Sequence, residues 1–176
     1  MKRRPVYINA TAMAIESARK LRPEARTELQ HIISVAFDEF RAGRDCANHW
    51  RTMADALNTA EMLSKAGIAS DAESKARIDD AMRVLAAAFE RFEERGSWTL
   101  RGAELGALDD GLWVARMQLE HCSLGEFEKA RRAVSERIRH ARAGNVPAAS
   151  PDTRAARQRL LLTGVRRDVR ITDARR

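Results

Sequence analysis

The sequence predicts an all-α protein: an antiparallel bundle of about six helices, followed by a basic C-terminal tail. Of its 176 residues, 44% are hydrophobic, 32% are charged, and only 9 are glycine and 4 proline, a composition typical of helix-rich globular proteins. Apolar residues also recur at steps of three and four, and residues that start or stop helices separate these segments. We expect one domain over residues 1–144, with a short arm at 1–9, and a basic linker and tail over 145–176.

The first two predicted helices lie on either side of a proline. Asn9 or Thr11 is expected to cap a helix that runs to about Leu21. Pro23 suits the first turn of the next helix, because the N–H that proline lacks would have no helical partner there. Gly43 is expected to end this second helix. Its core-facing stripe comprises Leu29, Ile32, Ile33, Ala36, Phe37 and Phe40.

The third and fourth helices have clear stop signals. Asp45 is the expected cap of the third helix, which should stop at Gly67. Ser70 and Glu73 have the spacing of a capping box, in which each side chain accepts a hydrogen bond from the other residue's backbone N–H. The fourth helix should therefore begin near residue 71 and end at Gly96.

The last two helices follow similar rules. Thr99 is the expected cap of a fifth helix that runs to about His121. Ser123 and Glu126 form a second predicted capping box, which opens the sixth helix. Gly144 is expected to close it.

The fifth helix has two unusual features. Gly102 and Gly106 lie four residues apart, and we expect them to allow close approach of a neighbouring helix. Trp113, Val114 and Met117 form a second apolar group, well away from the main apolar stripe. A helix that is apolar on two sides is either central in a bundle or part of a subunit interface. We favour the central position, with Trp113 buried inside the bundle, and keep the interface as the alternative.

Positive charge is concentrated in the last third of the chain. Residues 126–176 hold 14 Lys or Arg against 6 Asp or Glu, whereas residues 1–125 hold 18 against 19. Arginines so placed could contact phosphates without reading base sequence, or bind an acidic protein surface. The candidate binding residues are Arg132, Arg139, Arg142, Arg154, Arg157, Arg159, Arg166, Arg167 and Arg170.

The sequence predicts no catalytic residue, metal site or cofactor. Cys46, His49, His121 and Cys122 include zinc-ligand types, but adjacent helical residues such as His121 and Cys122 point about 100° apart, unlike the paired ligands of structural zinc sites. No nucleophile elbow, Walker loop or glycine-rich dinucleotide turn occurs. An enzyme is therefore not the favoured interpretation.

These observations favour a non-enzymatic binding or regulatory protein that acts through contact with another protein. The tail would add affinity for DNA, RNA or an acidic surface. Two alternatives stay open: a homo-oligomeric structural protein that assembles through Trp113, and a nucleic-acid-binding protein proper. We expect a cytoplasmic protein without a membrane partner, because no apolar run is long enough to cross a bilayer and no secretory leader is evident. Arginine supplies 27 of the 32 basic residues, a bias typical of GC-rich bacterial or phage genomes.

Overall fold

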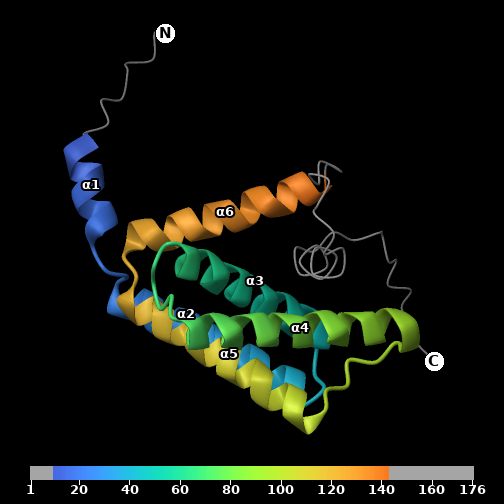
Figure 1. The fold of residues 1–176 in the computed structure, drawn as a ribbon. Coiled ribbons are helices and arrows are strands. Elements are labelled where there is room, and N and C mark those ends of the chain that lie inside the picture. The colour runs from blue at the N-terminus through green and yellow to red at the C-terminus, as the bar shows by residue number, and fades with distance from the viewer. Residues whose placement is uncertain (1–9, 143–176) are drawn as a thin grey trace, which may run out of the picture.

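The computed structural model describes residues 10–142 of the chain, which form an all-α bundle (Figure 1). The predicted fold class is thereby confirmed. The predicted arm at 1–9 and the tail from 145 onward lie outside the described residues. Within the described range the helices are α1 (Ala10–Ala18), α2 (Pro23–Arg41), α3 (Cys46–Lys65), α4 (Ala72–Arg95), α5 (Gly102–His121) and α6 (Leu124–Arg142).

Helix α3 is the centre of the bundle. It packs against α2, α4, α5 and α6, while α4 and α5 make the most extensive helix pair and α1 packs on α6. Met53, Leu57 and Leu63 of α3 are fully or almost fully buried. Leu85 of α4 and Leu112 of α5 are buried completely in the same core. Because α3 touches so many neighbours, it sets the positions of the other long helices.

The helix ends confirm some of the predicted signals. Pro23 lies in the first turn of α2. Gly43, Gly67 and Gly96 follow α2, α3 and α4 with φ of 77°, 96° and 69°, the left-handed conformation that glycine adopts without strain. The second capping box is also confirmed, since the Ser123 N–H donates to Glu126 Oε2 (2.8 Å) and the Glu126 N–H donates to Ser123 Oγ (3.3 Å).

Two predicted caps are wrong because a residue closer to the helix occupies the N-cap position. Asp71, not Ser70, caps α4, and its carboxylate accepts a hydrogen bond from the Ser74 N–H at 2.8 Å. Aspartate is as good a cap as serine, so the choice depends on the backbone path into the helix. Helix α5 begins after Arg101 rather than Thr99, and the Arg101 N–H donates to Glu104 Oε2 at 2.8 Å.

The starts of α1 and α3 also differ from expectation. Thr11 lies inside α1 and therefore does not cap it, while Asn9 lies outside the described residues. The helix ends at Ala18 rather than near Leu21, because the chain turns there and Leu21 is buried in the core. Asp45 precedes α3 as predicted, but its φ of 40° turns its carboxylate to the Asn48 side-chain amide (2.7 Å), and it makes no side-chain cap.

The expected close approach at Gly102 and Gly106 is wrong, because a Cβ atom at either position would meet nothing within 4 Å. The close contact occurs at Gly111 instead. A Cβ there would lie 2.3 Å from the Ala81 Cβ and 2.8 Å from the Arg77 carbonyl oxygen. Gly111 thus allows α5 to approach α4 closely, which explains why this pair is the most extensively packed.

We predict that Gly111→Ala lowers the free energy of unfolding by about 1–3 kcal/mol, the usual cost of overpacking a core. Gly106→Ala is the matched control on the same helix: it has open space around it, so alanine's higher helix propensity should raise stability by up to about 1 kcal/mol. Urea unfolding of both variants measures the two effects. Equal effects at the two positions would contradict this packing.

Candidate protein-binding groove

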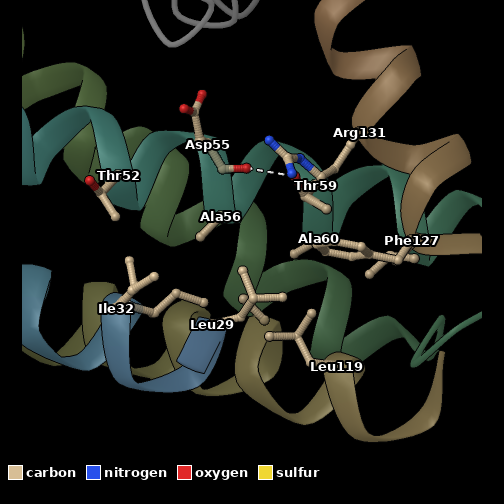
Figure 2. A pocket seen from close by; sticks show the side chains of 13 residues that line it. Leu29, Ile32, Thr52, Asp55, Ala56, Thr59, Ala60, Leu119, Phe127 and Arg131 are labelled. Atoms are coloured by element: carbon tan, nitrogen blue, oxygen red, sulfur yellow. Dashed lines mark hydrogen bonds between the residues drawn. The ribbon is translucent and has the colours of Figure 1, made fainter. Parts of the chain in front are cut away.

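An open groove lies alongside α3, between α2 and α6 (Figure 2). Its volume is about 210 Å³. Helix α3 forms one long side, α2 and α6 contribute the flanking walls, and α5 adds residues at the base. The lining comprises Leu29, Ile32, Ile33, Thr52, Asp55, Ala56, Thr59, Ala60, Leu63, Ala115, Leu119, Phe127 and Arg131.

The groove is mainly apolar and open to solvent. Ile32 remains 44% exposed, although it belongs to the apolar stripe that the sequence assigns to the core. Figure 2 shows Leu29, Ile32 and Leu119 pointing toward α3, and Phe127 reaching in from α6. Leu29 and Phe127 are only half-buried. Apolar side chains that remain partly in water on a concave surface are typical of a site that buries them against a partner.

Two charged residues lie at the edge of this apolar surface. Asp55 extends from α3 and Arg131 from α6. Desolvation raises the pKa of the Asp55 carboxyl, and the positive charge of Arg131 partly opposes that rise. In Figure 2 the Asp55 carboxylate points away from Leu29 and Ile32, so the charge lies beside the apolar lining and does not fill it. A partner would therefore meet an apolar centre with a polar rim, as in protein interfaces generally.

A buried polar contact positions the α6 wall. Arg137 of α6 donates to Glu61 Oε2 of α3 at 2.8 Å, and Lys65 donates to the other carboxylate oxygen at 2.8 Å. Arg137 also lies 3.4 Å from Asn58 Oδ1, and Asn58 is fully buried. Burial alone would raise the pKa of Glu61, but the hydrogen bonds and charges of Lys65 and Arg137 outweigh it and lower this pKa below 4.5. The carboxylate is thus held ionised, and it fixes α6 to α3.

The predicted basic residues of α6 lie partly on the surface. Arg132 and Arg139 are exposed, as expected for a face that could meet a polyanion. Arg142 is the last residue of α6. The other six candidates lie outside the described residues: Arg154, Arg157, Arg159, Arg166, Arg167 and Arg170.

The prediction that Trp113 is buried inside the bundle is wrong. Trp113 is 49% exposed. The Arg77 guanidinium lies 5.7 Å from the centroid of the Trp113 ring, within the range of a cation–π contact. Val114 is fully buried and Met117 is half-buried, so these three residues do not form one exposed patch. Helix α5 is nevertheless packed against α2, α3 and α4, because the buried positions from Leu108 to Leu119 cover more than one side.

The two cysteines among the candidate zinc ligands lie at opposite ends of the bundle. Cys46 begins α3, whereas Cys122 directly follows α5, at the other end of the bundle (Figure 1). Burial and the nearby Glu126 carboxylate raise the pKa of the Cys122 thiol to about 11. Among the residues that the structure describes, no three His, Cys, Asp or Glu side chains gather as a metal site would require. None of the helices in residues 10–142 is long and apolar enough to cross a membrane.

Sequence reasoning missed the groove. Helical periodicity identified Leu29 and Ile32 as apolar-face residues, but it could not show that α2 and α6 leave a gap between their apolar faces. The sequence contains one signal for the groove: Asp55 and Thr59 are polar residues beside the apolar stripe of α3, and both line the groove.

We predict that Arg137→Leu lowers the free energy of unfolding by about 1–3 kcal/mol at pH 7, because it leaves the Glu61 carboxylate buried with one fewer donor. A carboxyl whose pKa is lowered by folding stabilises the fold above its ordinary pKa, and this contribution is lost as the pH falls through the folded-state value. The difference between the natural protein and the variant should therefore shrink below pH 4.5. Urea unfolding across this pH range measures the difference.

Arg132→Leu, on the exposed face of α6, is the control and should have little effect on stability. A pH-independent difference for Arg137→Leu would contradict the assigned pairing of Arg137 with an ionised Glu61.

The groove therefore combines an apolar lining, two helical walls and a charged rim. No protein-family model, curated protein or solved structure matches this chain.

Proposed function

We propose that this chain is a non-enzymatic, cytoplasmic binding protein that acts through protein–protein contact, and that its groove accepts an apolar helix. The groove between α2 and α6 is the observation that carries the proposal. Amphipathic helices bind in such grooves by placing side chains spaced three and four residues apart against an apolar floor. Ile32, at 44% exposure, supplies apolar surface that such a helix would remove from water.

The dimensions of the groove support a short helix as its occupant. Its α3 side runs from Thr52 to Leu63, which is about 16 Å of helix at 1.5 Å per residue. A partner of three turns would cover this length. The small side chains of Ala56 and Ala60 leave room for the partner's larger ones, while Asp55 and Arg131 offer one charge of each sign to orient it.

The basic tail is the second part of the proposal. The bundle residues 10–142 contain 21 Lys or Arg and 22 Asp or Glu, whereas residues 145–176 contain 8 arginines and 3 aspartates. The bundle is thus close to neutral, and most of the excess positive charge belongs to the tail, with a further three charges at Lys2, Arg3 and Arg4. We propose that the tail adds non-specific affinity for nucleic acid or an acidic surface.

Photo-cross-linking tests the groove as a helix-binding site. A benzoylphenylalanine at Thr59 faces the groove, and the same group at Arg132 on the exposed side of α6 is the matched control. In cells that naturally produce the protein, we expect the cross-linker at position 59 to capture a discrete protein segment with apolar residues at helical spacing. The cross-linker at position 132 should not capture that segment.

The variant Ile32→Glu should remove this cross-link by placing a charge in the apolar surface. Because 44% of Ile32 is already exposed to solvent, the variant should keep the circular dichroism spectrum and thermal midpoint close to those of the natural protein. Cross-linking at Thr59 that is absent, or unchanged by Ile32→Glu, would overturn the proposal for the groove.

A shift assay at low salt tests the tail. We expect the full chain to retard DNA and RNA with little dependence on base sequence, and the retardation to weaken steeply as salt rises. A chain cut after Gly144 should lose it. Retention of binding by the shortened chain, or no binding by the full chain at low salt, would overturn this part of the proposal and leave the groove unaffected.

A further inference from the structure

Helix α1 is an apolar helix whose main contact in the bundle is with α6, and that contact leaves much of it exposed. Its sequence, ATAMAIESA, contains one charged residue, yet every residue from Ala14 to Lys20 is exposed. Ile15 is 57% exposed, more than Trp113 or Ile32. Figure 1 shows α1 extending beyond the end of the bundle. An isolated helix of nine residues is not stable in water by itself, and the contact with α6 leaves residues 14–18 exposed, so burial of Ile15 against a further surface would stabilise α1.

The direction in which α1 leaves the bundle is fixed at its C-terminal end. The Leu124 N–H donates to the Arg19 carbonyl oxygen at 2.7 Å, and Lys20 and Ser123 form an isolated β-bridge. Gly125 lies so close to Ser17 that a Cβ on the glycine would be 2.8 Å from the Ser17 carbonyl oxygen. These contacts direct α1 away from the bundle, so it cannot fold back into its own groove without breaking them.

The groove and α1 have matching dimensions and chemistry. At nine residues α1 is about 13 Å long, close to the 16 Å of the groove's α3 side. Both surfaces are apolar, with Ile15 exposed on the helix and Ile32 exposed in the groove. Each also carries one charge of either sign: Glu16 and Arg19 on the α1 segment, whose side chains are 2.8 Å apart, and Asp55 and Arg131 at the edge of the groove.

We propose that α1 of one copy lies in the α2–α3–α6 groove of a second copy, and that the second copy returns the contact. Two chains then form a closed, symmetric pair in which both apolar surfaces are covered. This inference rests on the proposed function, because it names the helix that the groove accepts. It assigns self-association to Ile15 and the groove, and none to Trp113.

The first test identifies the occupant in purified, full-length protein. Unlabelled chains carrying benzoylphenylalanine at Thr59 are incubated with a large excess of ¹⁵N-labelled natural chains until the pairs have exchanged, and are then cross-linked. We expect the captured peptide to come from α1 and to be mainly ¹⁵N-labelled, since most partners are then labelled chains. An α1 peptide that stays unlabelled despite this excess would show that the helix returns to its own groove, and a peptide from residues 145–176 would show that the tail fills it; either result overturns the inference.

The second test measures mass by light scattering. The natural protein should have twice the 19.8 kDa mass of one chain, and the Ile15→Glu variant should have the mass of one chain. Ile15→Leu keeps the apolar contact, and Trp113→Glu leaves both surfaces intact, so each should remain a pair. The inference would be overturned if the natural protein had the mass of one chain, or if the Ile15→Glu variant still had the mass of two chains.

These outcomes separate the inference from the function on which it rests. If cross-linking in cells captures a helix from a different protein at Thr59, then the groove is a helix-binding site and the second copy is not its occupant. If Thr59 captures nothing in cells or in purified protein, both proposals fail.

Discussion

Helix α3 is buried on more than one side, and this constrains the rest of the bundle. Its apolar residues Met53 and Leu57 are completely buried, and so is the polar side chain of Asn58. Glu61, also on this helix, is only 8% exposed. A buried carboxylate is stable only with hydrogen bonds and opposite charge around it. The partners come from Lys65 on the same helix and Arg137 on α6, so the burial of α3 requires α6 to lie where it does.

The groove is a consequence of this arrangement. Helix α6 is attached to α3 through Arg137 and through the buried Ala130 and Val134, whereas α2 packs on α3 and α5. Gln30 of α2 donates to the Arg116 carbonyl oxygen of α5 at 3.1 Å, which turns α2 toward α5. The two walls are therefore held by different contacts, and the apolar residues between them remain open to a partner.

Charge is unevenly distributed along the chain, and the proposed function uses this difference. Contacts in the apolar groove of the nearly neutral bundle would depend little on ionic strength. The contacts proposed for the arginine-bearing tail would be weakened by salt. The proposed self-association would cover the exposed apolar surface of α1 and that of the groove at once. A second copy would also place two basic tails on one particle, which raises the avidity for a polyanion.

Local sequence determined the six helices of residues 10–142 and several of their boundaries. Apolar spacing, the stops at Gly43, Gly67 and Gly96, and the Ser123–Glu126 box act within a few residues, so they can be read without knowing the neighbours. The same signals could not choose between adjacent caps such as Ser70 and Asp71, because the backbone path into a helix decides which side chain reaches the free N–H groups.

Only the tertiary structure decided which apolar residues are covered. Ile32 and Trp113 are exposed while Val114, beside Trp113, is buried, and helical spacing cannot distinguish them without the position of the opposing helix. The close approach at Gly111, and the pairing of Arg137 with a glutamate 76 residues away, likewise depend on how helices distant in the sequence meet. The sequence by itself thus set the helices and the uneven charge, whereas packing between helices created the groove, because a groove exists only where two helix faces fail to meet.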